Sequence, residues 1–263
     1  MSLGFLVTFL LNNFLKETYN ARKLKLEERI EKFLNKEVEL GEYSGIRFLG
    51  ISLANPRIID RENLNSEIKA NNIYVGLKPI QSLLNQKWII KINPENAEIN
   101  IDKDFFKSSK FNKDEKLSNK SRLNFDLNFN LAKNTTLKIK DIGLITKVKG
   151  RVIYSSNNKQ IIGNINSRFE GKGKLKLKLN TKLNQDFLRF DIFSNGVNLG
   201  KSEYIIANRK ILLKKGNFKS KFKFYKSSKQ TYCRGKFSLN KLIFKTSNLS
   251  ENINSDSLRF FCK

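Results

Sequence analysis

The stretch from Ile161 to Leu179 reads IIGNINSRFEGKGKLKLKL, and it decides the fold. Its odd-numbered positions are apolar or small, whereas most even-numbered positions are polar and many of them are lysine. A second stretch, Leu123 to Leu131, alternates in the same way as LNFDLNFNL. Successive side chains of a β-strand point to opposite faces of the sheet. A two-residue period therefore predicts strands with one apolar face and one polar, solvent-exposed face. The function then depends on what covers the apolar face.

From residue 122 onward the sequence predicts strands only, each about six to eleven residues long. Four polar segments mark the expected turns: Asn157–Asn158, Asn195–Gly196, Asn208 and Lys215–Gly216–Asn217. We expect residues 122 to 245 to form one twisted antiparallel sheet that curls with its apolar residues inward. After about residue 86 there is almost no helical pattern to cover that face. The predicted fold is therefore mainly β, with an N-terminal helix followed by a long curled antiparallel sheet that forms an open apolar groove. A closed barrel or a sandwich remains the alternative, because alternation alone does not separate them.

Acyl chains are a suitable filler for such a groove, because burying each CH₂ group is worth ~0.8 kcal/mol. The candidate lipid-facing residues are the apolar members of the alternating strands. They are Leu123, Phe125, Leu127, Phe129, Leu131, Ile165, Phe169, Leu175, Leu177, Leu179, Phe222 and Phe224.

The N-terminal region, residues 1–35, is expected to be a membrane-proximal helix, unbroken from residue 3 to residue 34. Its first part, Leu3 to Leu15, is apolar but would be only ~20 Å long as a helix, against a hydrocarbon core of ~30 Å. Three interpretations stay open: part of a membrane anchor, an interfacial helix with lysines and arginines against lipid headgroups, or the end of a buried helix. The candidate anchor residues are Leu3, Phe5, Leu6, Phe9, Leu10 and Phe14.

Three further regions follow this helix. Residues 36–104 predict a small β domain, with one strand region over 67–77, a short helix that Pro79 begins, and a turn at Asn93–Pro94. Residues 105–121 are polar and rich in lysine, which is typical of a linker or loop. Residues 122–263 hold the β-groove repeats.

The chain carries 51 basic and 24 acidic residues, a net charge of +27. Attraction to the phosphates of anionic lipid or nucleic acid is one explanation. A lysine-rich genomic bias is the other, since the lysines are spread through every strand. The phenylalanines of the alternating strands fall on the face opposite the lysine rows, whereas a base-stacking platform needs both on one face. This favours the absence of nucleic acid among the partners.

No catalytic constellation or metal-ligand pattern is visible, so we expect no enzyme, no cofactor and no metal. The chain has no histidine, the commonest general base and metal ligand. Its two cysteines, Cys233 and Cys262, could form a disulfide. The phase of Cys233 with Phe237 and Leu239 instead favours an inward-facing apolar thiol. The segment Gly171–Lys172–Gly173–Lys174 lacks the spacing of a phosphate-binding loop and is better explained as a β-bend.

Four segments follow one another in a specific order between residues 28 and 104: Ile30 to Gly41 followed by Gly45–Phe48, Ala70 to Leu84, Trp88–Ile92, and Ala97 to Asp102. In this order and spacing they resemble the start of the TamB proteins, in their cyanobacterial and chloroplast-envelope branch, within the AsmA-like superfamily. Two later segments, Gly216 to Phe222 and Tyr232 to Leu239, resemble the repeated β units of the same family.

The resemblance implies a body anchored in the inner membrane by one N-terminal helix and extending into the periplasm. It implies a role in outer-membrane protein assembly or translocation, in phospholipid transport between membranes, or in both. The partners would be the membrane, phospholipid and an outer-membrane assembly protein of the Omp85 type. This sequence is shorter than usual members of the family and lacks their C-terminal domain, which suggests a truncated or split gene. The alternative function is a soluble, basic nucleic-acid-binding β protein.

Overall fold

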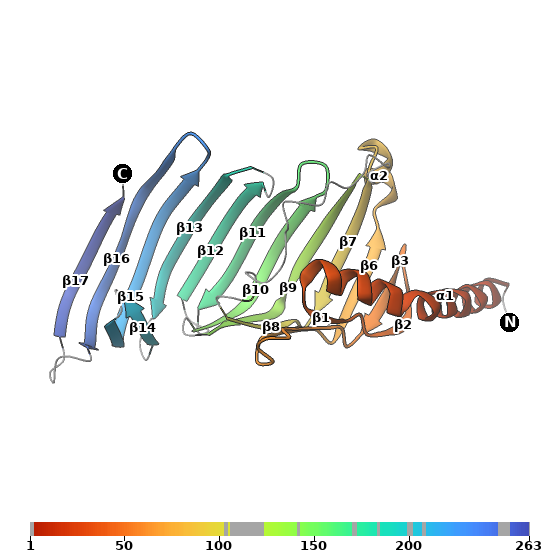
Figure 1. Cartoon of the computed structure of the whole chain (residues 1–263), viewed down its shortest axis with the longest axis horizontal. Helices are drawn as coiled ribbons and strands as arrows, with labels where there is room; N and C mark the ends of the chain where they lie inside the picture. Colours follow the sequence, from red (N-terminus) through yellow and green to blue (C-terminus); the bar gives the residue numbers. More distant parts are fainter. Residues whose placement is uncertain are drawn as a thin grey trace. The chain divides into compact units, whose positions relative to one another are not determined.

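The computed structural model describes residues 3–102, 105, 124–140, 143–169, 173–182, 185–198, 202–206, 209–246 and 253–262. The chain divides into two compact units, Met1–Leu127 and Asn128–Lys263. Each unit has its own hydrogen-bonded strands, and each is described by itself below (Figure 1).

The first unit combines a long helix with short strands. The predicted helix over residues 3 to 34 is confirmed. The elements in chain order are α1 (Leu3–Leu34), β1 (Glu37–Glu39), β2 (Glu42–Arg47), β3 (Gly50–Ala54), β4 (Arg57–Ile59), β5 (Glu67–Lys69), β6 (Asn72–Leu77), α2 (Pro79–Leu84), β7 (Trp88–Glu95) and β8 (Glu98–Ile101). The single strand region expected over 67–77 is two strands, β5 and β6, which pair with different neighbours, β8 and β7.

The turn expected at Asn93–Pro94 is wrong, because β7 continues through both residues and pairs Pro94 with Ile73 of β6. The chain reverses instead at Asn96, whose φ of 51° lies in the left-handed region that asparagine tolerates. Residues 106–121 of the expected linker lie outside the described residues. Phe105 is described, and it is buried rather than part of a solvated loop.

Helix α1 lies against β1 and β2 (Figure 1). Polar side chains of the helix bond to the backbone of this segment. The carboxylate of Glu31 accepts the backbone N–H of Val38 at 3.0 Å, and that of Glu27 accepts the N–H of Leu40 at 2.7 Å. The Tyr19 hydroxyl donates to the carbonyl oxygen of Gly41 at 2.9 Å. Unpaired strand edges attract other strands. Two carboxylates one helical turn apart therefore accept backbone N–H groups at the edge of β1 and hold the helix against this strand.

A buried ion pair forms just after the C-terminal end of α1. The Lys36 ammonium and the Asp60 carboxylate are 2.8 Å apart, and both side chains are almost fully buried. The ring of Phe105 lies 4.9 Å from the ammonium, and Asp60 also accepts the N–H of Glu62 at 3.1 Å. A buried charge is tolerated when it is paired and hydrogen-bonded. This pair joins the start of β1 to the end of β4.

Every element that the structure describes wholly in the second unit is a β-strand. Strand β9 (Phe125–Ile139) begins before the boundary and continues into this unit. The others are β10 (Gly143–Ser155), β11 (Gln160–Phe169), β12 (Gly173–Lys182), β13 (Phe187–Asn198), β14 (Ser202–Ile206), β15 (Arg209–Lys226), β16 (Thr231–Thr246) and β17 (Ile253–Cys262). The strands β10, β11, β12, β13, β15, β16 and β17 follow one another across the sheet, and each pairs antiparallel with the next. Strand β14 pairs with the first part of β15.

Several strands are longer than the expected six to eleven residues, and β15 reaches 18. The expected turns at Asn195–Gly196 and Lys215–Gly216–Asn217 are wrong, because these residues lie inside β13 and β15 at shifts of register. A bulge bends a strand without ending it, so the same glycine and asparagine residues that mark turns here mark bends. The turn at Asn157–Asn158 is confirmed between β10 and β11, and the one at Asn208 lies outside the described residues.

The predicted fold class is confirmed: the chain is mainly β, with an N-terminal helix and a large antiparallel sheet. In the second unit this sheet is open, since the registers that the structure describes give β17 one neighbour, β16, and do not join it to β9 or β10. The described part of the unit therefore forms neither a closed barrel nor a sandwich of two sheets.

Candidate lipid-binding face

The strand registers align the alternating residues of the second unit into rows that cross the sheet. Residues that are Cα partners point to the same face. Ile165 of β11 faces Leu177 of β12, which faces Ile192 of β13, which in turn faces Phe222 of β15. The next row joins Leu179, Phe190 and Phe224 in the same way. All these apolar side chains lie on one face, which we call the apolar face.

The structure brings together seven of the predicted lipid-facing residues on the apolar face: Ile165, Phe169, Leu175, Leu177, Leu179, Phe222 and Phe224. In β9, the Asn128 side chain accepts a hydrogen bond at 2.6 Å from Arg151, which lies on the face of the sheet opposite to the apolar face. Because side chains alternate along a strand, Phe129 and Leu131 lie on the apolar face. Phe125 and Leu127 lie on the segment of β9 that belongs to the first unit. Leu123 lies outside the described residues.

The apolar face is only partly shielded. Leu175, Leu177, Leu179, Phe222 and Phe224 are half-buried, whereas Phe169 is buried. Because every described element wholly within this unit is a strand of the same sheet, the unit supplies no helix or second sheet to cover them. Among the described elements of the unit, no helix or second sheet accounts for this partial burial.

Aromatic rings line the middle of the apolar face. Phe190 lies with its ring centroid 5.8 Å from that of Phe222 and 5.0 Å from that of Phe224, and Phe222 lies 6.1 Å from Phe237. Phe190, Ile192 and Phe237 were not among the predicted site residues. Their signal was present, because Leu188, Phe190 and Ile192 alternate with polar residues in the same two-residue period.

One row of the apolar face carries small hydroxyl side chains. Leu175 faces Ser194, which faces Ser220, which faces Phe237. Both serines are buried, and the Ser194 hydroxyl has no hydrogen-bond partner within the described residues. A buried hydroxyl without a partner costs free energy. This row therefore places two buried hydroxyl groups among the apolar side chains of the face.

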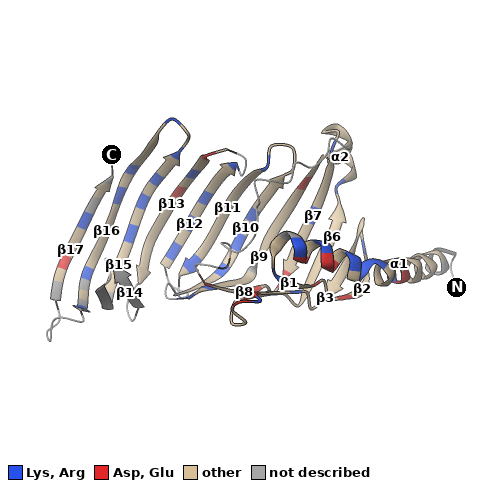
Figure 2. Cartoon of the chain, viewed as in Figure 1, with Lys and Arg blue, Asp and Glu red and all other residues tan. Residues whose placement is uncertain are grey.

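The opposite face is strongly cationic. Its lysines and arginines are exposed, and several are Cα partners of one another: Arg168 with Lys174, Lys221 with Lys236, and Lys223 with Arg234. Figure 2 shows the resulting bands of Lys and Arg across β11, β12, β15 and β16. Like charges directly opposite each other destabilise a sheet, so this face favours contact with anions.

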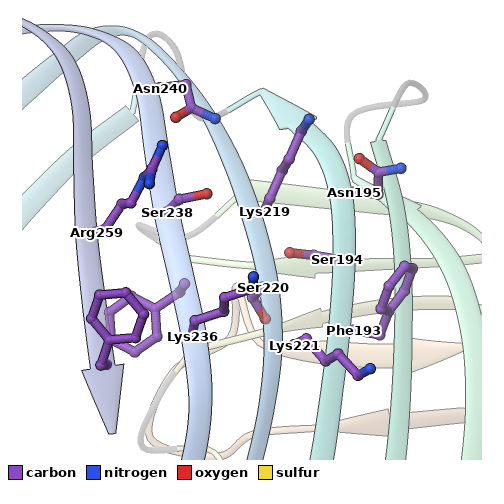
Figure 3. A pocket seen from close by; sticks show the side chains of 12 residues that line it. Phe193, Ser194, Asn195, Lys219, Ser220, Lys221, Lys236, Ser238, Asn240 and Arg259 are labelled. Atoms are coloured by element: carbon purple, nitrogen blue, oxygen red, sulfur yellow. The ribbon is translucent and has the colours of Figure 1, made fainter.

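Aromatic residues also lie on this cationic face, which corrects the expectation that phenylalanines and lysines occupy opposite faces. Phe193 is the Cα partner of Lys176 and of Lys221, and Phe261 is the partner of Lys236. The two rings flank a hollow of about 590 Å³. In Figure 3, Lys219, Lys221, Lys236 and Arg259 surround this hollow together with Asn195 and Ser238.

The first half of α1 carries exposed apolar side chains. Of the predicted anchor residues, Phe9, Leu10 and Phe14 are each more than half exposed, as is Val7, and Leu11 is exposed to nearly the same extent. Leu3, Phe5 and Leu6 belong to the helix, but their side chains lie outside the described residues. None of the described helices combines the length and the apolar character needed to cross a membrane.

Cys233 is the Cα partner of Phe224 and so lies on the apolar face, as its phase with Phe237 predicts. It is disulfide-bonded, which corrects the expectation of a free thiol. The chain has one other cysteine, Cys262. Disulfides persist in oxidising compartments and are rare where thiols are kept reduced.

No protein-family model matches the sequence, and no curated protein matches it significantly.

Proposed function

We propose that the chain is a membrane-attached envelope-biogenesis protein of the TamB type, in which the apolar face of the second unit holds phospholipid acyl chains. The observation that carries the proposal is an open sheet whose apolar residues are aligned strand by strand, while no described element of its unit forms a layer that covers them. A half-exposed apolar face of this extent marks a binding surface.

The dimensions of the apolar face suit an acyl chain. The row that runs from Gly150 through Leu177 to Gly235 crosses six neighbouring strands. At about 4.8 Å between strands, this row is roughly 24 Å long. One leaflet of a bilayer has a hydrocarbon thickness of roughly 15 Å, half of the ~30 Å core. A single row is thus longer than the hydrocarbon thickness that the acyl chains of one leaflet span.

The location proposed for the body is the periplasm, with α1 attached to the inner membrane. Three things support this: the exposed apolar side chains at the start of α1, the disulfide at Cys233, and the resemblance of residues 28 to 104 to the TamB proteins. The basic residues that follow the apolar segment would meet anionic headgroups at ~1 kcal/mol each. Participation in outer-membrane protein assembly, with a partner of the Omp85 type, belongs to the same proposal.

Lipid extraction and native mass spectrometry of the purified full chain test the proposal. We expect co-purifying phospholipid in the unmodified chain and a loss of most of it in Leu177→Glu, because a carboxylate on the apolar face is costly to desolvate. The matched control is Asn164→Glu, which adds the same charge to the opposite face at the neighbouring strand. Equal lipid content in a folded Leu177→Glu variant would contradict the proposal.

Binding of single-stranded nucleic acid is the second candidate function. The observation that favours it is the interleaving of Phe193 and Phe261 with Lys221 and Lys236 on the cationic face, since bases stack on aromatic rings within positive grooves. Fluorescence anisotropy with a labelled oligothymidine, measured over a series of salt concentrations, tests it. Binding that weakens on Phe193→Ala but not on Phe190→Ala would support this candidate, and the absence of binding at low salt would exclude it.

A further inference from the structure

An exposed apolar tip lies at one end of the strands of the first unit. It consists of the β2–β3 turn, the end of β6, helix α2 and the start of β7, and its large side chains are Phe48, Leu49, Leu77, Ile80, Leu83, Leu84 and Trp88. Phe48 is 87% exposed, Leu83 82%, Leu84 77% and Ile80 75%. Figure 1 shows α2 at the end of β6 and β7. Soluble surfaces rarely gather this many exposed large apolar residues.

Backbone hydrogen bonds hold the segments of the tip together. The N–H of Leu77 donates to the carbonyl oxygen of Leu49 at 2.9 Å, which joins the turn to the segment that enters α2. The Tyr74 hydroxyl donates to the carbonyl oxygen of Phe48 at 2.6 Å. A side chain at Gly76 would clash with the Tyr74 ring, so glycine is required there for this contact. The tip is therefore one built surface rather than two independent loops.

Helix α2 turns its apolar side outward. None of its residues is buried. Its polar Ser82 instead faces the sheet, where the hydroxyl accepts the N–H of Ile89 at 2.9 Å and the carbonyl accepts the N–H of Lys87 at 3.1 Å. An ordinary amphipathic helix buries its apolar side. This reversed orientation leaves Ile80, Leu83 and Leu84 exposed, where they can contact an apolar environment outside the protein.

The two segments of the tip carry only cationic side chains, and carboxylates of neighbouring strands pair with two of them. Segments 47–49 and 77–88 contain Arg47, Lys78 and Lys87 and no carboxylate. Arg47 and Lys87 are anchored by ion pairs of 2.7 Å to Glu95 and Asp126 on the strand β7 and at the start of β9. The arrangement is an apolar centre with a tryptophan at its margin and cations behind it, as in proteins that lie in a membrane interface.

We propose that the apolar tip inserts into the headgroup region of an anionic phospholipid bilayer. The surface is convex, made of a tight turn and a short helix, which suits penetration between lipids better than enclosure of a peptide. Arg47 stays exposed within its pair with Glu95, so its guanidinium can also contact anionic headgroups, whose attraction adds to apolar insertion. This contact is distinct from α1 and from the apolar face, so it goes beyond the proposed function and gives the first unit a membrane contact of its own.

The experiment uses Trp88, the sole tryptophan of the chain, as a probe within the tip. The full chain is mixed with vesicles of phosphatidylcholine and phosphatidylglycerol, and with vesicles that also contain brominated acyl chains. We expect the Trp88 emission to shift to shorter wavelength and to be quenched by the brominated chains. Replacing Leu83 and Leu84 by serine should weaken the partitioning that produces this shift about tenfold per leucine. Leu24→Ser, at an exposed leucine of α1, is the matched control and should leave the shift unchanged.

The outcomes separate the tip from the proposed function. If the chain sediments with vesicles while Trp88 emission stays that of a water-exposed indole, attachment is through α1 alone and the tip proposal is overturned. A shift that the Leu83 and Leu84 changes do not reduce overturns it as well. An equal shift with phosphatidylcholine alone overturns the preference for anionic lipid. None of these results touches lipid binding by the apolar face, which is measured by extraction.

Discussion

The rings of Phe190 on β13 and Phe224 on β15 stack with an interplanar angle of 22° and centroids 5.0 Å apart. The two residues are separated by 34 positions in the sequence, yet they are direct Cα partners. Their contact joins β13 to β15, which pair directly although β14 lies between them in the chain, and it lies at the middle of the apolar face.

The first prediction concerns this stack. Phe190→Ala should lower the free energy of unfolding by about 1–2 kcal/mol, less than the 3–5 kcal/mol of a fully buried phenylalanine, because the ring is half-buried. Phe193→Ala, three residues along β13 on the cationic face and 42% exposed, should change stability by less than about 0.5 kcal/mol. Urea unfolding followed by circular dichroism measures both, and equal losses would refute the assignment of the two faces.

The buried Lys36–Asp60 pair yields the second prediction. Asp60→Ala should destabilise the first unit by about 3–5 kcal/mol, because it leaves the Lys36 ammonium buried and without its carboxylate. The control is Asp186→Ala, which removes the carboxylate of an exposed pair with Lys226 and should cost no more than about 1 kcal/mol. A small effect of Asp60→Ala in thermal unfolding would show that the pair is open to water.

The third prediction concerns Tyr19 and alkaline pH. Burial, with a smaller contribution from the nearby Glu27 carboxylate, raises the pKa of the Tyr19 hydroxyl from 10.0 to about 12. The folded state then keeps this proton at a pH where the unfolded state has lost it. Stability that is fully present below pH 10.0 should therefore fall as the pH rises toward 12.

The comparison that isolates this effect is Tyr19→Phe. This variant loses the hydrogen bond to Gly41, at a cost of about 1 kcal/mol near neutral pH. Between pH 10.0 and 12 its stability should fall less steeply than that of the unmodified chain. Parallel curves of unfolding free energy against pH would show that Tyr19 does not titrate as described.

The buried serine row gives the fourth prediction. Ser194→Ala should leave the stability of the lipid-free chain unchanged or raise it by about 1 kcal/mol, because the hydroxyl has no hydrogen-bond partner within the described residues. Thr181→Val is the contrasting change, since the Thr181 hydroxyl donates to the carbonyl oxygen of Phe187 at 2.8 Å, and its loss should cost about 1 kcal/mol. Thermal unfolding of delipidated protein measures both variants. A clear loss on Ser194→Ala would mean that the hydroxyl has a partner after all.

Much of the second unit could be predicted from local patterns. The alternation in β11 and β12 identified which residues share a face, because the two-residue period of a strand is a local property of its backbone. The positions where strands end were harder to predict from the sequence. Asn195–Gly196 has the composition of a turn, but in β13 it forms a bulge, and only the hydrogen bonds offered by the neighbouring strands decide between the two outcomes.

By itself, the sequence determined the helix from residue 3 to residue 34, the strands that make up the described second half, and the alternation of apolar and polar residues in β11 and β12. Tertiary structure decided which residues of different strands meet. Only the register of β13 against β15 puts Phe193 beside Lys221 on the cationic face, and only packing buries Lys36 while exposing Trp88. Periodicity is fixed within a few residues of backbone, whereas burial and register depend on partners distant in the chain.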